Sequence, residues 1–309
     1  MREHSFVLFA ALGLLWCVAG ATAQTPSTVS AHINGIDPAL LAKAQAGDAD
    51  AQTQVAFNYG HPGGSPPDYA QAALWYRKAA NQGNASAQQD LGELYRVGHG
   101  VPQDGGLAVF WYRKAANNGN AAGQANLAQA YETGQGVAQD YGQAVVWYKK
   151  AAEQGLPFAE FRLGSLYDVG IGVTKDSAEA AKWYSKAAMQ GQADAEFSLG
   201  LLYENGEGVP QDYAQAVRWY RNLAEQGDPR GQFSLGVMYY NGLGIPQDFE
   251  EAYFWSNLGA AQDTRPPFVV GFERKTRDEF AAKLSPVQLA HVQDRCRKWL
   301  EDHSSKANP

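Results

Sequence analysis

Cysteine, excess positive charge and long apolar segments are scarce in this chain, and each scarcity excludes a class of protein. The 309 residues contain two cysteines, Cys17 and Cys296, too few for a framework of several disulfides. The formal net charge of −7 gives no support to nucleic acid or an anionic membrane surface as a partner. The N-terminal apolar run, 6–18, has 13 residues, whereas a membrane-spanning helix needs about 20. We therefore expect no stable membrane insertion.

Sequence patterns that mark catalytic, metal and cofactor sites are also missing. The six histidines are scattered, and none lies in the His-Glu-x-x-His spacing that places two imidazoles on one helix face. The chain has no Gly-x-Ser-x-Gly nucleophile elbow, no Cys-x-x-Cys pair and no phosphate-binding loop. These absences predict a protein without catalytic residues, metal or cofactor, and therefore not an enzyme.

The N-terminus has the pattern of a secretory signal peptide over residues 1–23. Arg2 supplies positive charge, the apolar run follows, and Ala21-Thr22-Ala23 offers a cleavage site before Gln24. Cleavage removes Cys17 and leaves Cys296 alone, so the mature chain can form no internal disulfide. We expect an exported protein, either periplasmic or secreted, whose remaining thiol is buried and inert; a redox or nucleophilic role is the alternative.

Tryptophan, in contrast, recurs with a fixed period of 36 residues. The series runs without insertion or deletion through Trp75, Trp111, Trp147, Trp183, Trp219 and Trp255. A unit of this length cannot bury its own apolar face, so successive copies are expected to stack into a solenoid. The predicted repeats are 47–82, 83–118, 119–154, 155–190, 191–226 and 227–262, preceded by a linker and capping helix at 24–46 and followed by capping helices and a tail at 263–309.

Each copy predicts two helices, which we call helix A and helix B. In the copy 83–118, Ala87, Leu91 and Tyr95 form one apolar stripe of helix A, and Trp111 with Tyr112 lies on the apolar face of helix B. Aspartates before helix B predict N-caps: Asp68, Asp104, Asp140, Asp176, Asp212 and Asp248. Glycines after it predict left-handed helix ends: Gly47, Gly83, Gly119, Gly155, Gly191 and Gly227. Basic pairs such as Arg113-Lys114 near the end of helix B predict a solvated row.

These copies resemble the Sel-one-like repeat family, a relative of the tetratricopeptide repeats. The matching motifs are Leu-Gly-x-x-Tyr at 91–95 and Ala-x-x-Trp-Tyr-x-x-Ala-Ala at 108–116, both repeated along the array. The resemblance implies an all-α, right-handed superhelical solenoid of antiparallel helix pairs with helical caps, of about 14 helices. It also implies a scaffold whose helix A lines a concave face that binds protein partners.

The tryptophans have two interpretations. At strict repeat spacing on an amphipathic helix they are expected to be the structural core of the repeats. A ladder of rings that stacks a ligand is the alternative.

Variation between copies indicates a candidate binding surface. The columns of residues 86, 90, 93 and 97 vary most and lie at i, i+4, i+7 and i+11, on one face of helix A. Exposed aromatic, aliphatic and charged side chains in these columns are candidate anchors: Phe158, Arg162, Leu201, Arg230, Phe57 and Glu93. The alternative is that an exposed stripe drifts without function.

Three functions are consistent with the resemblance and the predicted signal peptide. The first is an exported, non-enzymatic adaptor that binds protein partners of unknown identity. The second is a peptidoglycan-binding or β-lactam-binding protein or hydrolase, like cysteine-rich relatives in the family, although those carry a cysteine pair in each repeat and this chain has none there. The third is a secreted factor that acts on host proteins. The sequence predicts no particular partner.

Overall fold

The computed structural model describes residues 36–63, 66–261 and 267–304. The predicted signal peptide at 1–23 and its cleavage site lie outside these residues, as does most of the predicted linker. Within the described ranges the protein is entirely α-helical, with fifteen helices where about fourteen were expected and with no strand. The helices are α1 (Pro38–Gln45), α2 (Ala49–Gly60), α3 (Tyr69–Asn81), α4 (Ala85–Val97), α5 (Gly105–Asn117), α6 (Ala121–Thr133), α7 (Tyr141–Glu153), α8 (Pro157–Val169), α9 (Ser177–Met189), α10 (Ala193–Asn205), α11 (Tyr213–Glu225), α12 (Pro229–Asn241), α13 (Phe249–Ala260), α14 (Pro267–Ala281) and α15 (Pro286–Ser304).

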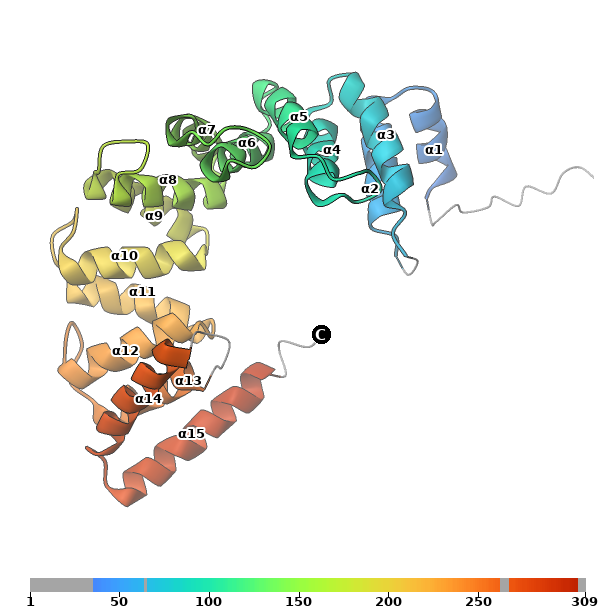
Figure 1. Cartoon of the computed structure of the whole chain (residues 1–309). Helices are drawn as coiled ribbons and strands as arrows, with labels where there is room; N and C mark the ends of the chain where they lie inside the picture. The colour runs from blue at the N-terminus through green and yellow to red at the C-terminus, as the bar shows by residue number, and fades with distance from the viewer. Residues whose placement is uncertain (1–35, 64–65, 262–266, 305–309) are drawn as a thin grey trace, which may run out of the picture.

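The helices stack in chain order, which confirms the predicted solenoid. Each repeat contributes one pair, with α2, α4, α6, α8, α10 and α12 as the A helices and the helix that follows each of them as B. From α1 to α14 every helix contacts the next one along the chain. Figure 1 shows the result as an open arc, with α1 at one end and α14 and α15 at the other.

The helix ends follow the predicted caps. Asp104 accepts a hydrogen bond from the Leu107 backbone N–H at 2.9 Å, and the other aspartates of this column cap their helices in the same way. The glycines after helix B all have positive φ. In the turn between A and B a second glycine allows close approach: a Cβ on Gly100, whose φ is 69°, would lie 2.2 Å from the Tyr69 carbonyl carbon. This turn therefore rests directly on the first residue of the preceding helix B.

A column of buried polar side chains joins the repeats. Gln88 in α4 donates its amide N–H to the Ala80 carbonyl of α3 at 3.0 Å and accepts from the Asn118 amide at 3.0 Å. Gln52, Gln124 and Gln232 make the same bond to the preceding helix. In α8 and α10 the column holds Glu160 and Glu196, both buried.

The tryptophans pack between helices to different extents. Trp75, Trp111, Trp183 and Trp255 are buried, whereas Trp147 and Trp219 are half-buried against the core.

The basic pairs of helix B contact their neighbours and do not form only a solvated row. The Lys78 ammonium lies 3.8 Å from the centre of a Trp75 ring, and Lys114, Lys150 and Lys186 lie in the same way over the tryptophans of their own repeats. Arg113 donates to the Tyr131 hydroxyl of the following repeat at 3.2 Å. Each basic pair therefore helps to hold its repeat or to join it to the next.

Additional helices cover the two ends of the stack. α1 contacts α2, and both α14 and α15 contact α13. Cys296 of α15 is buried, with its thiol 3.7 Å from the Phe254 carbonyl oxygen. Burial raises the pKa of this thiol, which disfavours the reactive thiolate. Of the helices in the described ranges, none is both long enough and apolar enough to cross a membrane.

Candidate partner-binding surface

The variable columns lie on an accessible face of each A helix. We call this surface the variable stripe; it comprises residues 86, 90, 93 and 97 and their equivalents every 36 residues in the six repeats. None of these 24 side chains is buried. On the same helices the apolar positions that recur between repeats, such as Ala87, Leu91 and Leu94, are buried. The helices therefore bury one face and leave the variable stripe available.

The apolar candidates lie on this surface and are exposed. Phe57 is 47% exposed, while Phe158 and Leu201 are each 38% exposed. The Phe57 ring stacks on His61 at the end of its own helix, with ring centroids 4.3 Å apart. The Phe158 and Tyr148 rings form a T-shaped pair, with ring centroids 6.2 Å apart. These rings are held by a contact on one side and present the other side to solvent.

The Arg162 side chain makes its contact within the protein. Its guanidinium forms an ion pair with Glu132 of α6, and the Tyr148 hydroxyl donates to the same carboxylate at 2.7 Å. The cluster therefore joins α6, α7 and α8. Burial, followed by the hydrogen bond to Glu132, raises the pKa of the Tyr148 phenol, so this hydroxyl remains a donor.

Arg230 is paired in a similar way. It contacts the Asp194 carboxylate of the preceding repeat and the Asp228 carboxylate at the start of its own helix, both at 2.7 Å, and lies 5.1 Å above the Phe197 ring. Burial would raise the pKa of Asp228, but the hydrogen bonds from Arg230 outweigh it and hold the pKa below its usual value. Because Asp194 also belongs to the variable stripe, the pair bridges two steps of this surface.

Glu93 completes the set of candidates and is also paired. Its carboxylate binds Arg96 on the same helix and accepts from the Tyr112 hydroxyl at 2.8 Å. The hydrogen bond from Arg96 is the largest influence on Glu93 and lowers the pKa of its carboxyl group. The sequence indicated the exposed columns but not these partners, since Glu132 and Asp194 lie 30 and 36 residues before the arginines they bind.

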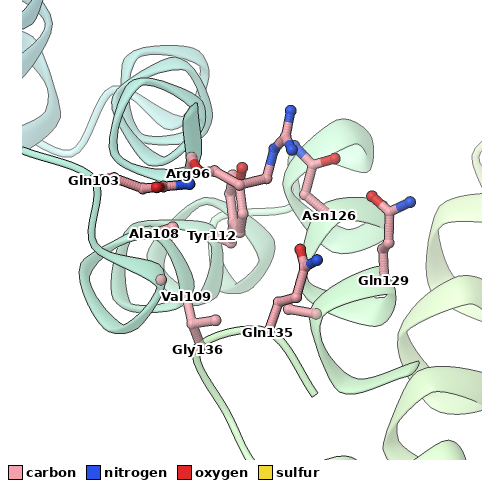
Figure 2. A pocket seen from close by; sticks show the side chains of 11 residues that line it. Arg96, Gln103, Ala108, Val109, Tyr112, Asn126, Gln129, Gln135 and Gly136 are labelled. Atoms are coloured by element: carbon pink, nitrogen blue, oxygen red, sulfur yellow. Dashed lines mark hydrogen bonds between the residues drawn. The ribbon is translucent and has the colours of Figure 1, made fainter. Parts of the chain in front are cut away.

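A cavity of about 490 Å³ opens beside the variable stripe between the second and third repeats. Figure 2 shows Arg96 of α4, Tyr112 of α5, and Asn126 and Gln129 of α6 around it. Gln103, Gly105 and the turn residues Gln135 and Gly136 also line it. Asn126 and Gln129 belong to the variable stripe, whereas the other residues were not predicted from the sequence to be part of a binding site.

The described part of the chain contains no cluster of side chains suited to bind a metal ion. No group of three or more histidine, cysteine, aspartate or glutamate side chains is close enough there to hold an ion. The surface therefore offers apolar side chains, paired charges and one cavity, which are features suited to recognition.

Comparison with known proteins agrees with this architecture. The family model described as Sel1 repeat matches residues 49–84, 85–120, 121–156, 157–192, 193–228 and 229–263. A Sel1 repeat protein from Oxalobacter formigenes is 37% identical, with a TM-score of 0.64, over 77% of this chain and 68% of its own. A protective antigen of uropathogenic Escherichia coli strains that displays an SLR fold is 28% identical, with a TM-score of 0.51, over 87% of this chain and 72% of its own. No curated protein matches the chain.

Proposed function

Because the chain belongs to the Sel1 repeat family, whose members generally act as scaffolds for protein interactions, we propose that it is an exported, non-enzymatic adaptor that binds a protein partner along the variable stripe. The observation that carries this proposal is that no side chain of the stripe is buried. Six consecutive A helices present their variable columns to solvent while packing their other faces. A solenoid offers such a continuous surface without any need for a catalytic site.

Apolar anchors along this surface support a protein as the partner. Phe158 and Leu201 lie on the A helices of neighbouring repeats, and each is more than a third exposed. Aromatic and aliphatic side chains that are exposed in the free protein and buried in a complex provide much of the binding energy of protein interfaces. The paired charges around them, such as Arg230 with Asp194, form a polar rim that is already ordered before binding.

The proposal is tested by capture of partners from the native envelope fraction. The mature chain beginning at Gln24 is compared with a variant carrying Phe158→Ala and Leu201→Ala. The matched control carries Phe110→Ala and Val146→Ala, which remove two side chains of helix B that are each 46% exposed. Arg162 is left intact, because reversing its charge would place a second acid beside Glu132.

We expect a protein that the wild type and the control capture equally and that the stripe variant loses. Equal capture by the stripe variant would reject this surface as the binding site. Capture of peptidoglycan without any protein would favour the cell-wall function over the adaptor.

Export is tested separately by the N-terminus of the protein in the cell. Mass spectrometry of periplasmic extract and culture medium should find the chain beginning at Gln24 in one of the two fractions, because a processed signal peptide ends at Ala23. Recovery of the chain with residues 1–23 still attached and in the cytoplasm would contradict export. Recovery in the medium would favour a secreted factor.

A further inference from the structure

The first residue of helix B differs between repeats in a way that the six copies make visible. This position is aromatic in four of them, as Tyr69, Tyr141, Tyr213 and Phe249. The second repeat has Gly105 there and the fourth has Ser177. The repeats with an aromatic residue at the first position of helix B therefore show where its ring lies. The second repeat has the same position but no ring.

Where this residue is aromatic, its ring lies between the A helix of its own repeat and the turn of the next repeat. The Tyr69 ring stacks on His99 in the turn of the next repeat, with centroids 4.5 Å apart. Its other neighbour is the last residue of the A helix in its own repeat: a Cβ on Gly60 would lie 3.9 Å from the Tyr69 ring. Phe249 shows the same neighbour, since its ring lies 5.5 Å from that of Tyr240 at the equivalent position.

The cavity of about 490 Å³ occupies this place in the second repeat. Arg96 is the equivalent of Gly60 and Tyr240, Gln135 is the equivalent of His99, and both line the cavity together with Gly105. Figure 2 shows Arg96 and Gln135 extending around this space. We propose that the cavity binds the phenol side chain of a tyrosine supplied by a protein partner, in the position that an internal ring occupies in the other repeats.

A hydrogen-bond donor in the wall favours tyrosine over phenylalanine. Gln139 donates to the Glu132 carbonyl at 2.8 Å and to the Tyr141 hydroxyl at 3.0 Å, and Gln211 makes the same two bonds to Glu204 and Tyr213. Gln103 is their equivalent and donates to the Arg96 carbonyl at 2.9 Å. Since residue 105 is glycine, Gln103 lacks the hydroxyl that accepts the second bond in those copies. A bound phenol would supply it.

The fourth repeat does not offer the same site. Its Ser177 hydroxyl lies 3.4 Å from the Asp168 carboxylate, in hydrogen-bond contact, and Asp168 is the equivalent of Arg96. Lys175 replaces the glutamine donor. The combination of a missing ring and a retained glutamine is therefore found in the second repeat.

The position of the cavity fits a partner that lies on the variable stripe. Asn126 and Gln129 belong to both the stripe and the cavity wall, so a segment bound along α6 could insert one side chain. In this respect the inference rests on the proposed function and names a residue type that the partner must present.

The test uses p-cresol, the side chain of tyrosine, and the peptide acetyl-Gly-Tyr-Gly-amide as probes. Their binding to the full mature chain is followed through the backbone amide signals of Gly105 and Gly136 in nitrogen-15 spectra. Gly105→Tyr fills the cavity with an internal ring, as in Tyr141, whose Cβ faces Gly172. The matched control is Gly106→Ala, which changes the next residue of α5 to the alanine found at 70, 178 and 214 and does not touch the cavity wall.

We expect saturable, mutually competitive shifts with both probes in the wild type and in Gly106→Ala, and at least a tenfold loss of affinity in Gly105→Tyr. Toluene, which lacks the hydroxyl, should bind roughly two-fold to ten-fold more weakly than p-cresol, as expected for one hydrogen bond. Gln103→Leu should reduce p-cresol to the affinity of toluene, and this variant keeps the test usable if Gly105→Tyr does not fold.

Several results would overturn the assignment. Equal binding of p-cresol by wild type and Gly105→Tyr would place the phenol elsewhere, and the lack of any saturable shift would show that the cavity is not a binding site. Binding of p-cresol without the peptide would assign the cavity to a small phenol and reject a tyrosine of a partner. Because these probes require no partner, their failure leaves the capture experiment on Phe158 and Leu201 as an independent test of the stripe.

Discussion

At the scale of single residues, the polar column between repeats contains two kinds of side chain with different proton requirements. Gln88 donates to the carbonyl of the preceding helix, whereas an ionised Glu160 or Glu196 has no hydrogen to give to the equivalent carbonyls of Ala152 and Ala188. Burial is the largest influence on both carboxyl groups and raises the pKa of each above the ordinary value of 4.5. The folded chain therefore binds these protons more tightly than the unfolded chain does.

The groups around the two carboxylates only partly offset burial. Gln190 donates to Glu160 at 2.7 Å, and the positive charge of Lys186 also lowers the pKa of Glu160. Gln226 and Asn222 donate to Glu196, while the negative charge of Asp228 raises the pKa of Glu196 further. A raised pKa in the folded state means that the stabilising contribution of the proton is complete below about pH 4.5 and is lost as the pH rises through the folded value.

Replacing Glu196 with glutamine should therefore stabilise the protein at pH 7. The amide can donate to the Ala188 carbonyl at any pH, and one such bond contributes about 1 kcal/mol. Urea unfolding of wild type and Glu196→Gln at pH 7 and pH 4 measures the effect, with Glu225→Gln on the exposed surface as the control. The gain should be smaller at pH 4, where the wild-type carboxyl group is itself protonated. A gain of equal size at both pH values would contradict this account.

The tryptophan column predicts unequal losses on truncation. Trp111 is 7% exposed, so Trp111→Ala should lower the free energy of unfolding by about 3 to 5 kcal/mol, as for other large aromatic side chains removed from a core. Trp147 is half-buried, and Trp147→Ala should lower it by less. Thermal melts of the two variants compare them directly. An unchanged melting temperature for Trp111→Ala would reject a core role and favour the alternative, in which the tryptophan rings stack on a ligand.

Local features of single residues could be predicted from the sequence, while pairs between repeats could not. The capping role of Asp104 follows from its place before an apolar period, because a cap depends on the next three residues. The partnership of Arg162 with Glu132 depends on how one repeat is rotated against the next. That rotation results from the sum of all packing contacts and has no short sequence pattern.

At the scale of the elements, glycines in two different turns have different roles: Gly100 lies in the turn between helix A and helix B, whereas Gly119 follows helix B. Gly100 and Gly119 both have positive φ, 69° and 81°, but a Cβ on Gly119 would meet nothing within 4 Å. On Gly100 it would overlap the Tyr69 carbonyl group. Gly119 therefore serves a helix end, whereas Gly100 also permits contact between repeats.

Alanine at the two positions should separate these roles. Gly119→Ala should cost about 1 to 2 kcal/mol, the strain of a left-handed residue that carries a Cβ. Gly100→Ala should cost more, because the turn must also move away from α3. The midpoint of thermal unfolding orders the two variants, and an equal loss for both would show that the close approach has no energetic weight.

The helices themselves were accessible from sequence because every copy repeats the same apolar periods and caps. A helix at the N-terminal end was predicted within 24–46, and Asp37 caps α1 by accepting from the Ala39 N–H at 2.9 Å. The cavity was not predicted. It results from a side chain that Gly105 lacks, and its meaning depends on where the ring of Tyr69 lies, which is known only from the structure.

At the scale of the whole molecule, contacts run almost entirely between consecutive helices, so stability should be shared locally. Ending the chain at Ser285, which removes α15, would uncover the face of α13 on which Val292 and Cys296 are buried. We expect this truncation to raise amide hydrogen exchange in α12 to α14 and to leave α2 to α5 unchanged. A uniform increase along the chain would show instead that the array unfolds as one cooperative unit.

The number of repeats and the class of fold both follow from the tryptophan period, because the period is uninterrupted. The curvature of the arc in Figure 1 does not, since small differences in the rotation of each repeat add along the stack.

The sixfold redundancy of the array has a consequence for how a site can arise in it. In a single-copy core, the loss of a large aromatic side chain leaves a defect that the whole fold must tolerate. Here the absence of a ring at Gly105 changes the packing in one repeat. The repeats that contain Tyr69, Tyr141, Tyr213 and Phe249 keep an aromatic ring at that position. In a repeat protein one unit can therefore gain a binding site through the loss of a side chain. The other repeats keep the fold and show which kind of group fits at that position.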